Sequence, residues 1–176
     1  MIPLYKIEDS YERIKRYLKP TRLEKSLNLS DEGSEVYLKL ENEQPLVKSF
    51  KIRGVLSKLT TLSKADISNT EITAISSGNH GIALAYCAQL LQIKSPIIYV
   101  PITAPTSKVE KIEYFGAKVV QIGNVYDDTH VKAKEIIAKN GYINVDSRED
   151  EIGVVGQGGV GIEILQQLPE VEVIIV

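Results

Sequence analysis

The chain has 176 residues, enough for one well-packed domain or two small lobes. With 43% hydrophobic residues, 25% charged residues and a formal net charge of -2, its composition excludes a disordered tail, and no basic patch indicates a nucleic-acid partner. No stretch approaches the ~20 apolar residues that span a bilayer, and the N-terminus lacks a signal-peptide core, so we expect a cytoplasmic protein without membrane contact.

The first third of the chain predicts short elements. Apolar residues near helical spacing predict a helix over 11–20 that stops at Pro20, and alternation predicts a strand over 35–42. Apolar residues then recur at three- and four-residue intervals over 49–64, which predicts one amphipathic helix there.

From about residue 69 onward, strands and helices alternate regularly. We predict strands at 71–76, 96–100, 117–122 and 142–145, with helices between them at 78–92, 106–115 and 126–140. This order predicts an α/β fold in which crossover helices connect the strands of a parallel sheet. A helix over 161–168 and a strand over 171–176 are expected to follow.

Lys51 is the first candidate for chemistry. It lies between Phe50 and Ile52, where a strand is expected to give way to a helix. Desolvation at such a place lowers the pKa of the lysine and favours the neutral amine, which is the form that makes a Schiff base. The ordinary alternative is a lysine whose aliphatic stem packs on apolar neighbours.

The second candidate is the sequence "SSGNHG" at 76–81, which follows an apolar strand and opens a helix. Backbone N–H groups at such a junction bind anions, and the lack of an accompanying lysine or arginine favours a carboxylate over a pyrophosphate. A simple helix cap with turn glycines is the structural alternative. The single cysteine, Cys87, lies on an apolar helix face and is expected to be a packing thiol.

The third candidate is "GQGGVG" at 156–161, which has the spacing of a dinucleotide-binding fingerprint. Such a site needs a strand directly before the glycines, and "EDEIGVV" is a poor strand. The alternative is that small residues let the start of a helix pack closely against a sheet. No cluster of cysteine, histidine and acidic residues has the spacing of a metal site.

Five motifs together resemble one family. In order and spacing, "LKLENEQPLVKSFKIRG", "SSGNHGIALAYCAQ", "VPITAPTSKVEKIEYFGAKVV", "YDD" and "GQGGVGIEIL" are similar to the N-terminal half of the pyridoxal 5'-phosphate (PLP)-dependent serine/threonine dehydratases and serine racemases. These enzymes have the tryptophan-synthase-β-like fold, called fold type II. The resemblance covers the chain from about Pro20 to Val176. It implies that "GQGGVG" begins a helix and holds no nucleotide.

The resemblance implies a role for each site residue. Lys51 would form a Schiff base with PLP and shuttle the α-proton, Phe50 would pack near the cofactor ring, and Asn79 would hydrogen-bond the ring hydroxyl. The substrate carboxylate would be held by Ser76, Ser77, Gly78, Asn79 and His80. In racemases the position of Ser77 supplies the second catalytic base, so some racemase chemistry stays open.

The same resemblance implies a domain division and a function. Residues 1–68 would begin the large PLP-binding domain, 69–147 would form the small domain, and 148–176 would return to the large domain, a three-layer αβα unit that is truncated here. The expected activity is conversion of L-threonine or L-serine to a 2-oxo acid and ammonia by an enzyme that is a dimer or tetramer of identical subunits when complete. Serine racemization, cysteine-synthase-like β-replacement, and a non-catalytic interaction module remain alternatives.

Overall fold

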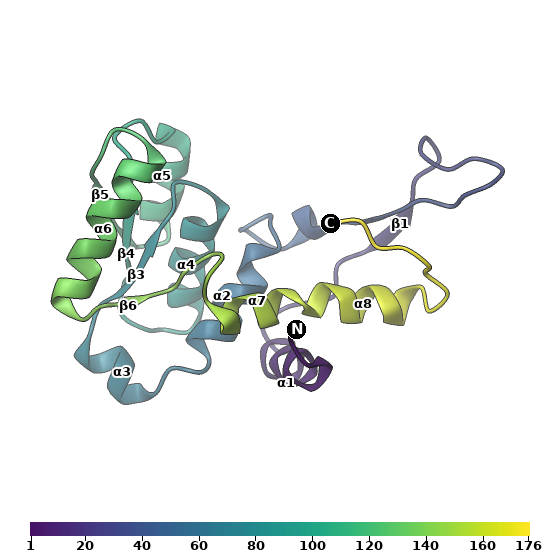
Figure 1. Cartoon of the computed structure of the whole chain (residues 1–176), viewed down its shortest axis with the longest axis horizontal. Coiled ribbons are helices and arrows are strands. Elements are labelled where there is room, and N and C mark those ends of the chain that lie inside the picture. Colours follow the sequence, from purple (N-terminus) through teal and green to yellow (C-terminus); the bar gives the residue numbers. More distant parts are fainter.

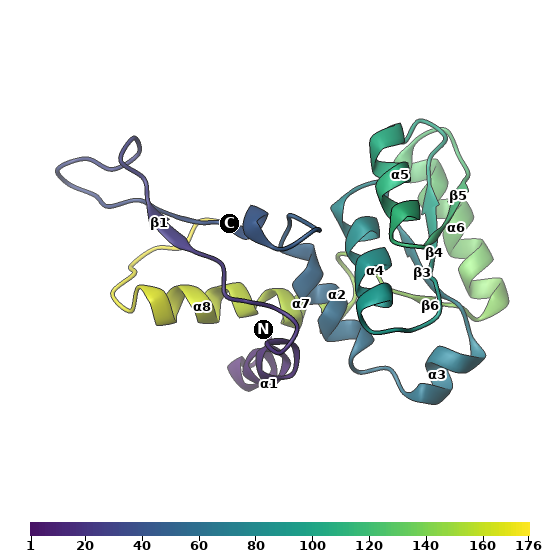
Figure 2. The same ribbon diagram turned by 180° about the vertical axis from the view of Figure 1, so that it is seen from behind.

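The structure is a computed structural model that describes residues 1–176. One end of the molecule holds a four-stranded sheet with its helices, and the other holds the N-terminal helix, a two-stranded hairpin and the last helix (Figures 1 and 2). The helices α2 (Lys51–Leu59) and α7 (Glu151–Gln157) lie between these two ends and pack against each other.

The four-stranded sheet is parallel throughout. Its strands have the order β5-β4-β3-β6, and the helices α4, α5 and α6 connect them in sequence. The bounds are β3 Ile72–Ile75, α4 Asn79–Leu90, β4 Ile97–Val100, α5 Thr106–Tyr114, β5 Lys118–Gln121, α6 Tyr126–Asn140 and β6 Ile143–Asn144. The predicted α/β fold with a parallel sheet and crossover helices is therefore confirmed.

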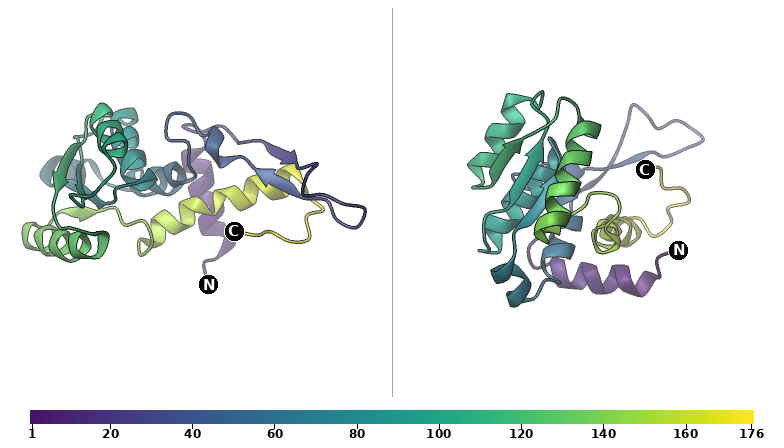
Figure 3. Two further views of the ribbon diagram at one scale, coloured as in Figure 1. Left: turned by 90° about the horizontal axis from the view of Figure 1, so that it is seen from above. Right: turned by 60° about the vertical axis from the view of Figure 1, so that its left-hand side comes forward.

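Helices cover both faces of this sheet. The helix α6 lies on one face, and α4 and α5 lie on the other (Figure 3). On the α6 face, Ala133 and Ile137 pack against Ile75 and Tyr99. The helix α4 is apolar all around because α2 covers the side that the sheet does not.

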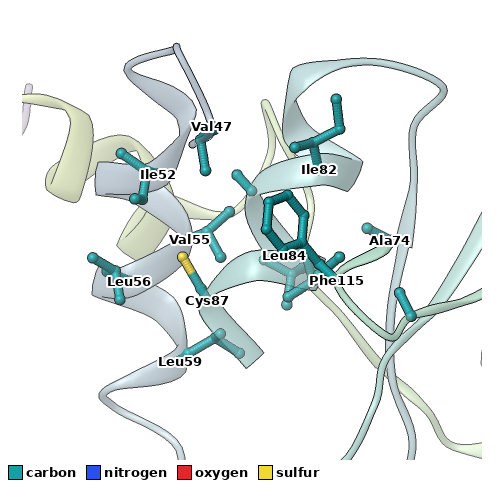
Figure 4. Close-up of a cluster of buried hydrophobic side chains, with 14 of the residues drawn as sticks. Val47, Ile52, Val55, Leu56, Leu59, Ala74, Ile82, Leu84, Cys87 and Phe115 are labelled. Carbon is teal, nitrogen blue, oxygen red and sulfur yellow. The ribbon is translucent and has the colours of Figure 1, made fainter. Parts of the chain in front are cut away.

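The larger hydrophobic core lies where α2 meets α4 (Figure 4). Val55, Leu56 and Leu59 of α2 face Cys87 of α4, and all four side chains are buried. Burial raises the pKa of the Cys87 thiol far above its ordinary value, so the thiolate does not form near neutral pH. The interpretation of Cys87 as a packing thiol is confirmed.

The remaining elements lie outside the four-stranded sheet and the α2–α7 pair. They are α1 Leu4–Ile14, the antiparallel pair β1 Leu23–Lys25 and β2 Tyr37–Lys39, a 3-10 turn η1 Glu41–Glu43, α3 Lys64–Asn69 and α8 Gly159–Gln167. The helix α8 runs alongside the hairpin, as the view from above shows (Figure 3). No helix in the structure combines the length and the apolar character required to cross a bilayer.

Two helices differ from the prediction. The expected helix over 49–64 is shorter than predicted: α2 ends at Leu59, and Ser63 caps a second helix, α3, that begins at Lys64. The Ser63 hydroxyl accepts the Asp66 backbone N–H, and the Asp66 carboxylate accepts the Ser63 N–H, so this capping box starts a new helix. The first helix begins at Leu4 and ends at Ile14, several residues earlier than predicted.

The predicted strand over 171–176 is wrong. The segment forms no ladder with any strand, and its apolar side chains are exposed, with Ile175 at 92%. A strand needs a neighbour to bond its N–H and C=O groups, and apolar alternation alone does not supply one. A second difference concerns the segment that leads into "GQGGVG": it forms a helix, α7, although the sequence pattern predicted none there.

Candidate active site

A pocket of about 260 Å³ opens at the edge of the sheet where the parallel strands end. Its walls come from the start of α2, the loop between β3 and α4, the start of α6, and the loop between β6 and α7. It is lined by Ser49, Phe50, Lys51, Ile75, Ser76, Asn79, His80, Tyr126, Ser147 and Arg148. Ligands of open parallel sheets bind at this edge.

Lys51 is the first residue of α2, and its backbone N–H donates to the Ser49 hydroxyl at 3.3 Å. The side chain is half-buried, and Nζ lies 4.8 Å from the centroid of the Phe50 ring. Burial first, and the charge of Arg148 second, lower the pKa of Lys51. The neutral, nucleophilic amine therefore forms more readily at Lys51 than at an ordinary lysine.

The loop 76–80 brings the N-terminus of α4 to the pocket. The loop packs closely on the first turn of α4: a β-carbon on Gly81 would lie 2.6 Å from the Ser76 carbonyl oxygen. The Ser76 hydroxyl accepts the Gly78 N–H at 3.2 Å, and no side chain caps α4. Uncapped N–H groups and the helix dipole then favour an anion such as a carboxylate at this place.

His80 joins this loop to the opposite wall. Its Nε2 donates to the Val145 carbonyl oxygen at 2.7 Å, which fixes the segment that leads to Ser147 and Arg148. Burial lowers the pKa of His80, the hydrogen bond to Val145 opposes that effect, and the Lys51 charge adds to it. The imidazole is therefore neutral at pH 7 and holds the two loops together.

The pocket brings together most of the residues selected from the sequence. Phe50, Lys51, Ser76, Asn79 and His80 line it, while Ser77 and Gly78 lie in the same loop but not on the wall. The Asn79 side-chain oxygen accepts a hydrogen bond from Lys108 Nζ at 3.2 Å.

Five lining residues were missed: Ser49, Ile75, Tyr126, Ser147 and Arg148. A signal existed for three of them, because Tyr126, Ser147 and Arg148 follow the ends of β5 and β6. Carboxyl ends of parallel strands meet at one edge, so the predicted strands alone would have placed those residues near Ser76.

The "GQGGVG" motif holds no dinucleotide fingerprint. Helix α7 precedes it and helix α8 follows it, whereas that fingerprint requires a strand before the glycines. Three of its four glycines, Gly156, Gly158 and Gly159, serve close packing, although against helices rather than the expected sheet. A β-carbon on Gly156 would lie 2.7 Å from the Arg53 carbonyl oxygen of α2, and one on Gly159 would lie 2.9 Å from the Tyr11 ring of α1.

The site therefore combines a lysine of lowered pKa and an uncapped helix N-terminus on one parallel α/β lobe, an arrangement suited to Schiff-base chemistry at a carbonyl group. The profile of the family described as "Pyridoxal-phosphate dependent enzyme" matches residues 14–176. The chain belongs to this family, and its cofactor is pyridoxal phosphate.

Curated relatives include the L-threonine ammonia-lyase of Thermotoga maritima, which is 38% identical over 177 residues, covering 100% of this chain and 43% of the relative. The catabolic L-threonine dehydratase TdcB of Staphylococcus aureus N315 is 36% identical and matches over 100% of this chain and 51% of its own length. The chain thus spans about half the length of the curated relatives that it matches.

Solved structures of PLP enzymes also resemble the chain. The threonine deaminase isoform 2 of Solanum lycopersicum is 30% identical, with a TM-score of 0.86 over 96% of this chain and 46% of that one. A pyridoxal 5'-phosphate-dependent aspartate racemase also has a TM-score of 0.86 at 30% identity, over 96% of this chain and 52% of that one. The fold is therefore that of fold-type-II PLP enzymes.

Proposed function

We propose that the whole protein is an ammonia-lyase that converts L-threonine or L-serine to a 2-oxo acid and ammonia. The observation that carries the proposal is the pairing of Lys51, with its lowered pKa, and the uncapped N-terminus of α4 in one pocket. The names of the curated relatives, L-threonine ammonia-lyase and L-threonine dehydratase, support this choice of substrate.

The residues present fit the cofactor. Lys51 would bond to it covalently, the Phe50 ring beside Lys51 would form an apolar wall, and Asn79 would hydrogen-bond it from the loop side. When bound, PLP supplies an electron-withdrawing ring that stabilises negative charge at the substrate Cα.

The chain's own residues perform the remaining tasks. The backbone N–H groups of the loop 76–80 bind the substrate carboxylate and so orient the Cα–H bond toward Lys51. Lys51 in its neutral form accepts the α-proton at Nζ. The β-hydroxyl leaves as water, and hydrolysis of the product imine takes up one water and releases ammonia.

Racemization is the second candidate. It requires a proton donor on the face of Cα opposite Lys51, and Ser77 is the hydroxyl that we propose for that role. Similarity to the serine racemases of Dictyostelium discoideum and maize, at 27% and 29% identity, supports keeping this candidate. Chiral analysis of remaining substrate separates the two activities, because only a racemase yields the D-amino acid.

We also propose the division into residues 1–68, 69–147 and 148–176, a cytoplasmic location, and a homodimer or homotetramer for the whole protein. Limited proteolysis tests the division through cleavage near residues 68 and 148. Light scattering tests the oligomeric state.

The test of function uses the whole protein saturated with PLP. We expect 2-oxobutanoate from L-threonine or pyruvate from L-serine, with turnover abolished by Lys51→Ala. Lys48→Ala is the matched control, since Lys48 is exposed and lies outside the pocket. Cysteine formation from an activated serine and sulfide would instead identify a β-replacement enzyme, and no turnover of any amino acid would favour the non-catalytic module.

The chain of 176 residues can be tested in the same way. We expect it to bind PLP more weakly than the whole protein and to have little activity. A cofactor absorbance band that saturates during titration and disappears in Lys51→Ala would show that these residues alone organise a cofactor site. Robust turnover by the chain alone would contradict the expected dependence on the rest of the protein.

A further inference from the structure

Arg148 occupies a wall of the pocket that the proposed reaction does not use. It lies in the loop between β6 and α7, and this loop is anchored at both sides. The Asp146 carboxylate accepts the backbone N–H groups of Arg148 and Glu149 at 2.8 and 2.9 Å. His80 Nε2 donates a hydrogen bond at 2.7 Å to the carbonyl oxygen of Val145, the residue before Asp146. The backbone at Arg148 is therefore fixed with respect to the loop 76–80.

Arg148 is an exposed residue that lines the pocket, and its guanidinium forms neither an ion pair nor a side-chain hydrogen bond within the chain. The neighbouring carboxylates are engaged elsewhere. Glu149 pairs with Lys134 at 3.1 Å, and Asp150 caps α7 and pairs with Lys58 at 2.8 Å. None of the ten pocket-lining residues is acidic.

The pocket thus contains two cationic groups, Lys51 and Arg148, without a compensating anion. Their repulsion is part of the reason why the pKa of Lys51 is lowered. Lys51 is committed to the cofactor and to proton transfer, and the α4 N-terminus provides for one carboxylate. The proposed reaction of a monocarboxylic amino acid assigns no group to Arg148, and an arginine matches a carboxylate in geometry as well as in charge.

We propose that Arg148 binds a second carboxylate on the substrate side chain, so that the preferred substrate is a β-hydroxylated dicarboxylic amino acid such as 3-hydroxyaspartate. This inference rests on the proposed ammonia-lyase chemistry and replaces L-threonine or L-serine with a dicarboxylic amino acid as the preferred substrate. The reaction balances: Lys51 accepts the α-proton, the Cβ–O bond breaks, and the leaving hydroxyl takes up one proton, equal to the one removed from Cα, and departs as water. Hydrolysis of the product imine consumes one water, and the net products are oxaloacetate and ammonia.

The kinetic test uses the whole protein with PLP and measures ammonia release from 3-hydroxyaspartate, L-threonine and L-serine. We expect the highest kcat/KM for 3-hydroxyaspartate. Arg148→Met removes the charge but keeps much of the length, and it should lower this kcat/KM about tenfold to a hundredfold, with L-serine changed less than about twofold. Arg148→Lys should recover part of the loss. Arg16→Met, an exposed arginine outside the pocket, is the matched control and should leave all three substrates unchanged.

A binding test separates this inference from the proposed function. Calorimetry on the whole protein compares succinate, a dicarboxylate, with butyrate, a monocarboxylate of the same carbon number. We expect succinate to bind more tightly and Arg148→Met to weaken succinate alone, about tenfold or more. If no amino acid is turned over, the proposed function fails, while this preference for succinate would still support the role of Arg148.

Three results would overturn the inference. Equal losses for 3-hydroxyaspartate and L-serine in Arg148→Met would assign Arg148 to the carboxylate that both substrates share. A weaker affinity for PLP in that variant would assign it to the cofactor phosphate. Equal binding of succinate and butyrate would leave Arg148 without a selective ligand.

Discussion

Lys51 and His80 line the same pocket, and burial lowers the pKa of both. The effect serves different ends at the two residues. For Lys51 the neutral amine is the reactive form, whereas for His80 the neutral imidazole is the form that donates one hydrogen bond to Val145 without bringing a third charge into the pocket. A proton on His80 would add to the repulsion that Lys51 and Arg148 already exert.

The shift at His80 predicts how stability depends on pH. The folded pKa lies below the ordinary value of 6.5, so the unfolded chain binds more protons between these two values. The free energy of unfolding should therefore fall as the pH is lowered from about 7.5 to about 5. Urea denaturation across that range should show a shallower decline for His80→Gln than for the wild type. Parallel declines would contradict the assignment of this dependence to His80.

At the scale of elements, a buried network of charges connects α2 to α8 and to the hairpin. Arg53 of α2 is fully buried and donates to Glu41 of η1 twice at 2.8 Å and to Glu163 of α8 at 2.7 and 2.9 Å. Lys39 of β2 pairs with Glu163 at 2.7 Å. The two positive charges of this network balance its two negative charges. The network holds α2 in place at Arg53, two residues after Lys51.

Removing one member of this network leaves an uncompensated buried charge. Arg53→Met should therefore lower the free energy of unfolding by roughly 3–5 kcal/mol, and Arg53→Lys should not restore it, because lysine cannot bridge two carboxylates with paired hydrogen bonds. Chemical denaturation measures both. Arg22→Met is the matched control, since the Arg22–Glu43 pair lies in solvent and should matter far less. A change of similar size in the two arginine variants would refute the network's structural role.

The packing of α7 on α2 depends on a close approach at Gly156. A β-carbon there would lie 2.3 Å from Ser57 Cβ, a contact that the two helices cannot absorb without moving apart. Gly156→Ala should lower the free energy of unfolding by about 1–3 kcal/mol, and it should also lower turnover because α2 carries Lys51.

Gly161→Ala is the control for Gly156→Ala. A β-carbon at Gly161 meets nothing within 4 Å, so alanine in this helical position should stabilise the chain by up to ~1 kcal/mol. Thermal denaturation compares the two variants. Destabilisation by Gly161→Ala, or none by Gly156→Ala, would mean that helix contact does not decide the result.

At the scale of the whole molecule, the segment 171–176, which follows α8, leaves four apolar residues exposed. Val173, Ile174, Ile175 and Val176 are 73%, 45%, 92% and 118% exposed, and the chain covers none of them. Contiguous apolar surface of this kind favours association. We expect the 176-residue chain to self-associate with rising concentration, and Val173→Lys with Ile175→Lys to reduce this in analytical ultracentrifugation. Unchanged association in the double variant would place the contact elsewhere.

Local patterns predicted the sheet and its crossover helices well. The helix 126–140 has the predicted bounds, and β3, β4 and β5 lie within the predicted strands. These segments carry their own signals, since buried strands are continuous apolar runs and the helices between them have clear starts. The split between α2 and α3 was missed because apolar spacing outweighed the capping box at Ser63.

In the candidate site, the sequence identified Phe50, Lys51, Ser76, Asn79 and His80, all of which line the pocket. Arg148 was missed because its role depends on the positions of other groups. Only in the folded chain does its guanidinium lie near Lys51, while the carboxylates close to it in sequence are held by Lys134, Lys58 and backbone N–H groups.

The sequence alone determined the α/β class and the family, because both depend on residue type, period and the order of motifs along the chain. It also predicted Lys51 as the lysine on which the proposed chemistry centres. The tertiary structure alone decided that "GQGGVG" packs helices, that the segment 171–176 forms no strand, and that Arg148 is an unpaired cation in the pocket. The physical reason is that close approach, strand pairing and charge compensation are relations between segments distant in sequence, and only folding brings those segments together.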